Sequence, residues 1–242
     1  MSTLQELDKL STYLDSLSAR YGREVVFRDF LEIVVCTLSM GREEERFHDI
    51  KKRYEIEDIE VFTKAFAALV VEMDNKGEGL KDVLGEYFQL YFYNERLGQF
   101  FTPQTICDLM TAVVGPSDAK TIHDPCVGSG RQFLSHAKSQ REKGGEPATY
   151  IGADISEMCC LITLINMCLN GLKGMVLHAD SLRLEVWRSW TVVGGEKMGV
   201  PFIVEHRGGE EVEEVPVSEV VQEEPQPQPL KRTVQFRRFA AV

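Results

Sequence analysis

Hydrophobic residues recur at helical spacing through about the first 95 residues of the chain. The earliest set consists of five leucines three or four positions apart, Leu4, Leu7, Leu10, Leu14 and Leu17. This spacing places the leucines on one face and predicts an amphipathic helix. Further helices are predicted over residues 24–40, 59–73 and 84–93, and the first of these is apolar on most faces and therefore buried. The pattern predicts a helical N-terminal domain over residues 1–95.

From residue 97 onward, short β-type runs alternate with helical segments. Thr102 and Pro103 are typical of a helix start, as N-cap and first helical residue. Strands are predicted over residues 120–123, 149–153 and 175–178, with helices over 131–143 and 156–169 between them. Such alternation is typical of a parallel sheet joined by crossover helices. The sequence therefore predicts an α/β domain over residues 96–205.

The periodic pattern is lost near the C-terminus. Residues 206–242 are rich in glutamate and proline and include a small basic cluster, which predicts a disordered or extended tail. At most one further strand is expected after Asp180, over residues 190–193 or 202–204. The sheet would then end in an apolar edge strand. We expect a second copy of the chain, the tail or a partner to cover that edge.

Composition limits the classes of function. The net charge of −11 lacks the basic balance of a free-standing DNA-binding protein, so another subunit or a small basic patch would have to bind phosphate. No apolar run reaches the roughly 20 residues that span a bilayer, and the N-terminus has no signal-peptide pattern. We expect a cytoplasmic protein. The six cysteines show no CxxC spacing, which predicts buried reduced thiols and no metal site.

The motif DPCVGSG, residues 124–130, stands where the first predicted strand of the α/β domain ends and a helix begins. Gly128 and Gly130 allow close approach of a ligand and a sharp turn. The next two strands end near Asp154 and Asp180. Because the carboxyl ends of parallel strands share one edge, the three aspartates should meet where open α/β sheets bind nucleotides. Asp154 could accept both ribose hydroxyls there, and Asp180 an adenine amino group.

Each feature alone also has a structural explanation. The GSG segment lacks the third glycine of the dinucleotide fingerprint, since Phe133 stands at that position. Asp124 or Asp180 could be a helix cap or turn residue. An unrelated nucleotide-binding α/β protein therefore stays open as a hypothesis.

The order of the motifs is more specific. GQFFTP, residues 98–103, precedes DPCVGSG by about twenty residues, and ADSL, residues 179–182, follows after the strand that ends near Asp154. In this order the chain resembles the modification subunit of type I restriction-modification systems and related N6-adenine DNA methyltransferases, over roughly residues 1–182. The resemblance implies a helical N-terminal domain followed by an incomplete Rossmann-like S-adenosylmethionine-dependent methyltransferase domain.

The resemblance also implies S-adenosylmethionine as the cofactor. The residues it assigns to cofactor binding are Gln99, Phe100, Phe101, Thr102, Pro103, Gln104, Asp124, Gly128, Ser129, Gly130, Asp154, Ile155, Asp180 and Ser181. S-adenosylmethionine carries a sulfonium and an ammonium but no phosphate. A site ringed by carboxylates therefore suits it better than NAD, whose pyrophosphate Asp124 would repel.

Enzymes of this family use an Asn-Pro-Pro-(Phe/Tyr) motif to polarise the adenine amino group and stack on the flipped base. No Asn-Pro-Pro occurs here, and the closest segment is Gly199-Val-Pro-Phe202, which leaves Pro201 and Phe202 as the catalytic candidates. Glycine supplies no side-chain acceptor. We expect a cofactor-binding protein of the DNA adenine-N6 methyltransferase family that does not transfer methyl groups to DNA alone. The alternative is a non-catalytic scaffold or cofactor-sensing homologue that acts through partner subunits.

Overall fold

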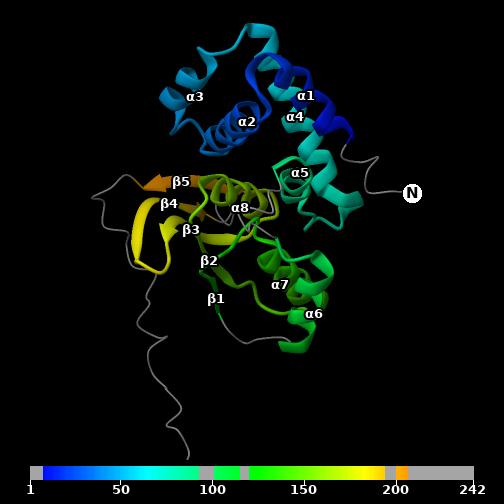
Figure 1. Cartoon of the computed structure of the whole chain (residues 1–242). Coiled ribbons are helices and arrows are strands. Elements are labelled where there is room, and N and C mark those ends of the chain that lie inside the picture. The colour runs from blue at the N-terminus through cyan, green and yellow to red at the C-terminus, as the bar shows by residue number, and fades with distance from the viewer. Residues whose placement is uncertain (1–7, 93–100, 115–119, 194–199, 207–242) are drawn as a thin grey trace, which may run out of the picture. The chain divides into compact units, whose positions relative to one another are not determined.

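The structure is a computed structural model that describes residues 8–92, 101–114, 120–193 and 200–206. They belong to one compact unit spanning residues 1–208. Its first part is helical (Figure 1). The elements are α1 (Asp8–Tyr21), α2 (Arg23–Leu38), α3 (Glu44–Lys51), α4 (Ile56–Asp74), the short 3-10 helix η2 (Asn75–Gly77) and α5 (Val83–Phe92).

Most of this helical part was predicted by apolar spacing. The leucine repeat continues through α1, where Leu10, Leu14 and Leu17 are fully buried or nearly so, and the other predicted helices correspond to α2, α4 and α5. Helix α3 was not predicted. It buries only Ile50, so its sequence carries no apolar stripe from which a helix could be inferred.

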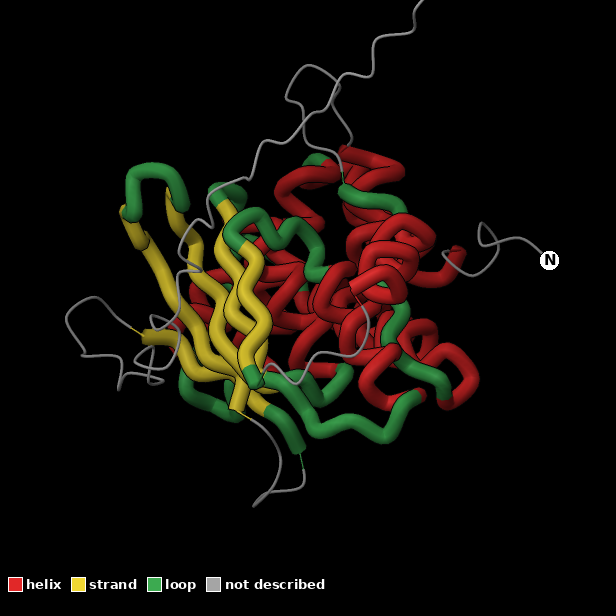
Figure 2. The backbone as a smooth tube through the Cα atoms, turned by 90° about the horizontal axis from the view of Figure 1, so that it is seen from below, coloured by secondary structure: helices red, strands yellow, loops and turns green. Residues whose placement is uncertain are grey.

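The second part of the unit alternates strands and helices as expected. The elements are α6 (Gln104–Val114), β1 (Thr121–Asp124), α7 (Arg131–Glu142), β2 (Thr149–Asp154), α8 (Glu157–Leu169), β3 (Lys173–Asp180), β4 (Glu185–Val193) and β5 (Phe202–His206). The five strands lie side by side in chain order, and β1, β2 and β3 are parallel. Figure 2 shows the sheet with helices packed against it. The fold is therefore of the predicted α/β class, with a helical region followed by a sheet with crossover helices.

The expectation of at most one strand after Asp180 was wrong. Both candidate segments form strands, and β4 runs antiparallel to β3 and to β5. Buried apolar residues on one face, Trp190, Val192 and Ile203, hold this pair against the helices. The first three residues of β4 are exposed, so burial does not alternate over its whole length, and the pattern underestimates the strand. The sheet is mixed rather than wholly parallel.

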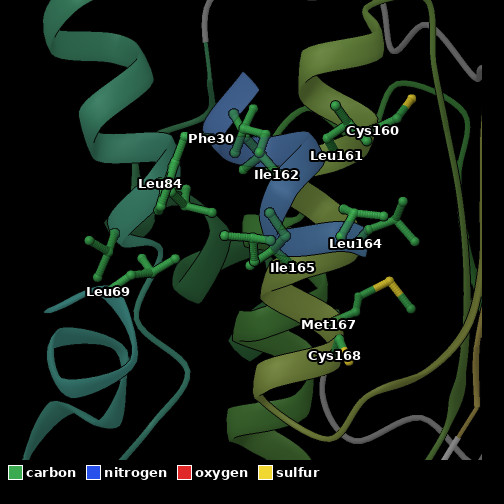
Figure 3. Close-up of a cluster of buried hydrophobic side chains, with 14 of the residues drawn as sticks. Phe30, Leu69, Leu84, Cys160, Leu161, Ile162, Leu164, Ile165, Met167 and Cys168 are labelled. Carbon is green, nitrogen blue, oxygen red and sulfur yellow. The ribbon is translucent and has the colours of Figure 1, made fainter. Parts of the chain in front are cut away.

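Helix α8 lies at the centre of the core. Every residue from Cys159 to Cys168 is buried, as expected of a helix that is apolar all round. It contacts β2, β3 and β4 on the sheet and α2 and α5 in the helical part. Figure 3 shows its side chains in one buried cluster with Phe30, Leu69 and Leu84. One continuous core thus joins the two parts, and the domain boundary drawn at residue 95 stays a prediction.

A partly buried ionic network fixes the β4–β5 pair to the helices. Arg188 on β4 donates to both carboxylate oxygens of Glu205 on β5, at 3.2 Å each. The same guanidinium donates to Glu32 of α2 at 3.1 Å and to Glu157 of α8. Arg46 of α3 reaches Glu205 at 2.6 Å. Burial alone would raise the pKa of Glu205, but the hydrogen bonds and charges of the two arginines outweigh burial and lower it.

Within the described part of the chain, no helix is both long and apolar enough to cross a membrane.

Candidate cofactor site

The three aspartates expected at the strand ends lie along one edge of the sheet. Asp124 ends β1 opposite Gly152, and Asp154 ends β2 opposite His178. Asp180 ends β3 opposite Glu185 of the antiparallel β4. Each aspartate therefore lies two residues beyond the previous one, and together they form a diagonal row. The structure thus brings together the carboxylates that the strand pattern predicted.

The glycine loop after β1 needs its glycines for backbone reasons. Gly128 and Gly130 have φ angles of +57° and +80°, in the left-handed region that side chains disfavour. The side chain of Asp124 starts the turn by accepting the N–H of Cys126 at 2.9 Å. The loop is then tied to β2, because the N–H of Val127 donates to the carbonyl of Ala153 at 2.9 Å.

Asp154 holds the glycine loop against the start of α8. Its carboxylate accepts the N–H of Gly128 at 2.9 Å and the N–H of Ser156 at 2.8 Å. Burial raises its pKa, the two N–H groups oppose that rise, and the nearby charge of Asp124 adds to it. Each carboxylate oxygen can accept two hydrogen bonds, so Asp154 keeps acceptor capacity for the hydroxyls of a ribose.

Asp180 and Ser181 have structural roles at the end of β3. The carboxylate of Asp180 accepts the N–H groups of Leu182 and Arg183 at 3.0 Å each, so it is a turn residue. The hydroxyl of Ser181 donates to the carbonyl of Pro125 at 2.7 Å, which links this turn to the glycine loop. Ile155 is 63% exposed beside them. Their contact with a cofactor stays a prediction.

Phe101 covers the glycine loop. A Cβ placed on Gly128 would meet the Phe101 ring at 3.1 Å, and this ring stacks on Phe88 with centroids 5.2 Å apart. The carbonyl of Thr102 accepts Nη1 of Arg131 at 3.3 Å. The cavity between this segment and the loop is about 70 Å³, and its lining includes Asp124 and Ser129.

The residues fit S-adenosylmethionine in charge and in hydrogen-bonding capacity, but the cavity is small. Small-molecule sites usually hold roughly 300–1,000 Å³. Among the described residues, no lysine or arginine forms an ion pair with Asp124 or Asp154, whose carboxylates accept backbone N–H groups. A nucleoside cofactor with a positive charge therefore suits these carboxylates.

Several predicted site residues lie elsewhere. Gln104 donates to Ser135 at 2.6 Å and to Asp108 at 2.9 Å, so its amide is used in packing α6 on α7. Pro103 is exposed and does not line the small cavity. Gln99 and Phe100 lie outside the described residues.

The catalytic candidates Pro201 and Phe202 are not near the aspartates. Phe202 pairs with Val193 of β4, and Val192 pairs with Gly174 at the start of β3. Phe202 therefore lies at the edge where β3 begins, whereas Asp180 lies where β3 ends. Its ring carries the guanidinium of Arg42 at 4.7 Å. The structure corrects the assignment: this Pro-Phe pair is part of the β4–β5 packing and is remote from the candidate cofactor site.

Sequence reasoning missed a buried carboxylate beneath the glycine loop. Asp82 accepts the Ser129 hydroxyl at 2.5 Å and Nε of Arg131 at 2.7 Å. It also accepts Nδ2 of Asn166 at 2.7 Å, and that amide group donates to the carbonyl of Ser129 at 2.8 Å. Thr163 donates to the carbonyl of Gly128 at 2.8 Å. Two polar residues three positions apart in an otherwise apolar helix were the available signal, whereas Asp82 had none.

The cysteines are packing residues, as expected. Five of the six are buried and only Cys126 is exposed. Burial raises the pKa of the Cys159 and Cys168 thiols to about 12, and it also raises the pKa of Cys107, which lines the small cavity. Thiols in this state are poor nucleophiles at neutral pH.

The parallel strands with their crossover helices define a Rossmann-like α/β domain, and comparison with known proteins specifies the family. Residues 80–204, just over half of the chain, match the model of the N-6 DNA Methylase family. The chain belongs to this family. The resemblance inferred from the motif order is confirmed, and an unrelated nucleotide-binding protein is excluded. A search of curated proteins found no significant match.

Similar solved structures are distant. One is a type I restriction-modification methyltransferase subunit from Streptococcus thermophilus, with 19% identity over 73% of this chain and 39% of that chain, at a TM-score of 0.38. A modification subunit assigned to a type I restriction enzyme of Vibrio vulnificus has 18% identity over 51% of this chain and 28% of that chain, at a TM-score of 0.37. A protein from Listeria monocytogenes assigned as a class I S-adenosylmethionine-dependent methyltransferase has 14% identity over 74% of this chain and 54% of that chain, at a TM-score of 0.37. This chain spans about half or less of their lengths.

Proposed function

We propose that this chain binds S-adenosylmethionine as the cofactor-binding component of a DNA adenine-N6 methylation system. The observation that carries the proposal is the pair Asp124 and Asp154 on either side of the glycine loop. Both accept backbone N–H groups, and neither forms an ion pair with a lysine or arginine of the described chain. A cationic ligand would supply the missing charge.

The residues divide the cofactor between them by chemistry. Asp154 would accept ribose hydroxyls, and Asp124 would face the positively charged methionine end beside Gly128. The exposed side chain of Ile155 offers an apolar surface for the adenine ring. When bound, S-adenosylmethionine supplies an electrophilic methyl group on a positively charged sulfur. Adenosine ligands that carry phosphates instead would meet like charges at both aspartates.

Methyl transfer to adenine needs a polar acceptor for the N6 amino group. The chain has no Asn-Pro-Pro sequence, and the nearest substitute, Phe202, lies at the opposite edge of the sheet. We therefore propose that methyl transfer to DNA requires residues of another subunit. A DNA contact supplied by that subunit also agrees with the net charge of −11, since phosphate binding needs basic surfaces. A cytoplasmic location stays a prediction.

Calorimetric titration with S-adenosylmethionine tests the cofactor proposal. We expect saturable binding to the full chain, and an affinity about 10- to 100-fold lower for Asp154→Ala, because loss of hydrogen bonds to a charged group costs about 1.5–3 kcal/mol. Asp49→Ala, at a carboxylate that is 63% exposed on α3, is the matched control and should bind like the wild type. A folded chain that shows no binding would refute the proposal.

Transfer of labelled methyl groups to adenine-containing DNA tests the second part. The isolated chain should give no transfer above background, although it binds the cofactor. A clear signal would show that a loop of this chain supplies the acceptor after all. Binding without transfer, even with candidate partner subunits added, would favour the non-catalytic, cofactor-sensing alternative.

A further inference from the structure

In the described part of the chain, an arginine lines the candidate cofactor site without forming an ion pair with its aspartates. Arg131 is the first residue of α7, directly after the glycine loop, and it lines the same small cavity as Asp124. Its guanidinium keeps a positive charge at neutral pH. A guanidinium that was free beside these carboxylates would pair with them and would oppose the entry of a cationic ligand. The charge of Arg131 therefore has to be neutralised from outside the cavity.

Asp82 supplies the neutralising charge. Its Oδ2 accepts Nε of Arg131 at 2.7 Å and the Ser129 hydroxyl at 2.5 Å. Its Oδ1 accepts the amide of Asn166 at 2.7 Å and the N–H of Gly85 at 2.8 Å. An ionised carboxylate offers about four acceptor positions, and the four donors fill them. Asp82 is thus held as an ionised partner for Arg131.

The pair is shielded from water. The side chains of Arg131 and Asp82 are 8% and 2% exposed. Salt screens charges of such low exposure much less than surface charges, and removing one partner of a buried pair leaves the charge of the other uncompensated. Asp82 does not line the small cavity, whereas Arg131 does. The carboxylate therefore acts on the cavity through the arginine.

The guanidinium of Arg131 lies at the cavity wall formed by the segment over the glycine loop. Nη1 donates to the carbonyl of Thr102 at 3.3 Å, and the guanidinium carbon lies 5.8 Å from the centroid of the Phe101 ring. Cys107, which also lines the cavity, shows how far these charges reach. Burial raises the pKa of its thiol most, Arg131 lowers it, and several aspartates, Asp82 among them, raise it.

We propose that Asp82 is a specificity-determining residue that favours a positively charged cofactor by neutralising Arg131. With the pair intact, Asp124 and Asp154 determine the sign of the charge that a ligand meets, and a sulfonium is attracted. Without Asp82, the guanidinium adds a positive charge at the cavity wall and repels the sulfonium. This inference rests on the proposed function, because it assigns Asp82 a role in the binding of S-adenosylmethionine.

Two ligands that differ in charge at the sulfur test the proposal. S-adenosylhomocysteine lacks the methyl group and the sulfonium charge of S-adenosylmethionine. Calorimetric titration of the full chain with each ligand gives the ratio of their dissociation constants. In Asp82→Asn this ratio should move at least about 10-fold against S-adenosylmethionine, a change of about 1.4 kcal/mol. Loss of loop support alone would weaken both ligands by the same factor and leave the ratio unchanged.

Three further variants separate charge from support of the loop. Ser129→Ala removes a hydrogen bond to Asp82 but no charge, so it should weaken both ligands and keep their ratio. Arg131→Gln leaves the negative charge of Asp82 without its arginine, so its ratio should move in favour of S-adenosylmethionine. The double variant Asp82→Asn/Arg131→Gln has neither charge, and its ratio should return to the wild-type value.

Circular dichroism checks the folding of each variant, and Arg131→Gln still tests the proposal if Asp82→Asn does not fold. An unchanged ratio in a folded single variant would overturn the proposal, as would a double variant whose ratio equals that of Asp82→Asn. If the folded wild type binds neither ligand, the proposed function fails together with this inference. If the wild type binds both and the ratio is insensitive to these charges, the role of Asp82 alone is refuted.

Discussion

Two groups of carboxylates in this molecule have opposite surroundings. Glu32, Glu157 and Glu205 gather around Arg188 in the β4–β5 region, and Arg46 adds a second guanidinium. At the ends of β1 and β2, Asp124 and Asp154 are held by backbone N–H groups instead. The negative charges of the first group are compensated by the two arginines of the same fold. In the part of the chain that the structure describes, no lysine or arginine pairs with the second group, which lies beside a loop whose geometry depends on two glycines.

The pKa shifts follow this difference. The arginines lower the pKa of Glu205 despite its burial, whereas burial raises the pKa of Asp154. A lowered pKa means that the charged form stabilises the folded state, and a raised pKa means that the charge costs stability. The comparison teaches that the carboxylates near Arg188 serve the fold, while those at the glycine loop are suited to bind a cation.

The largest effect is expected from Arg188→Met. Removing this guanidinium takes the ion partner from Glu157 and leaves Glu32 and Glu205 with Arg46 alone. Breaking a fully buried ion pair from one side costs about 3–5 kcal/mol, so about 3 kcal/mol is expected for this partly buried network. Chemical denaturation would measure the loss. Arg183→Met, at an arginine that is 75% exposed near Asp180, should change stability by less than about 0.5 kcal/mol. Equal stability of the two variants would remove the contrast between the regions.

Asp82→Asn is expected to cost less stability than Arg188→Met, and it should also weaken cofactor binding. The variant keeps one acceptor oxygen but weakens the contact with Arg131 and the Ser129 hydroxyl, at a cost of about 1–3 kcal/mol. Because the glycine loop loses its support, affinity for S-adenosylmethionine should fall by about 10-fold or more. Calorimetry at a temperature where the variant is fully folded separates the two effects. Unchanged affinity would show that the loop does not need Asp82.

Gly128→Ala separates backbone strain from access to the site. Its φ is +57° and the added Cβ would meet Phe101 at 3.1 Å. Gly144 has a φ of +65° with nothing within 4 Å of an added Cβ, so Gly144→Ala is a matched control for strain. Both should lose about 1 kcal/mol of stability. Only Gly128→Ala should lose cofactor binding, and similar binding by both variants would contradict the location of the site.

The smallest effects are two losses on acidification, one of stability at Glu205 and one of cofactor affinity at Asp154. Because the pKa of Glu205 is lowered from 4.5, its contribution is complete above that pH and is lost as pH falls through the folded-state value. The stability difference between wild type and Glu205→Gln should therefore shrink below about 4.5. The raised pKa of Asp154, above its usual 3.8, means that cofactor affinity falls with acidification before an ordinary aspartate would protonate. Affinity that is constant down to pH 4 would contradict its role.

Local patterns predicted much of the fold because local physics determines it. Leucine spacing gave α1, and the strand–helix alternation with its strand-end aspartates placed Asp124 and Asp154 on one edge. The antiparallel β4–β5 pair depends on contacts between Arg188, Glu32 and Glu205, which lie up to 173 positions apart in the sequence. No local pattern shows such contacts.

The candidate site divides in the same way. The glycine loop could be predicted from the sequence because turns with positive φ need glycine. Its support by Asp82 could not, because Asp82 lies 47 residues before Ser129. The motif GQFFTP placed Phe101 and Thr102 correctly beside the loop, whereas the side chain of Gln104 turns to Ser135. Pro201 and Phe202 were assigned only because their short segment resembles the Asn-Pro-Pro-(Phe/Tyr) motif. Their strand direction, which sets the edge they occupy, could not be read from the sequence.

The most direct test compares two adenosine ligands of opposite charge. S-adenosylmethionine and ATP share the adenine and ribose but differ in charge. A calorimetric titration with each therefore measures how ligand charge affects binding beside Asp124 and Asp154. The account predicts saturable binding of S-adenosylmethionine and no measurable binding of ATP under the same conditions. Equal or tighter binding of ATP, or no binding of S-adenosylmethionine by the folded chain, would contradict it.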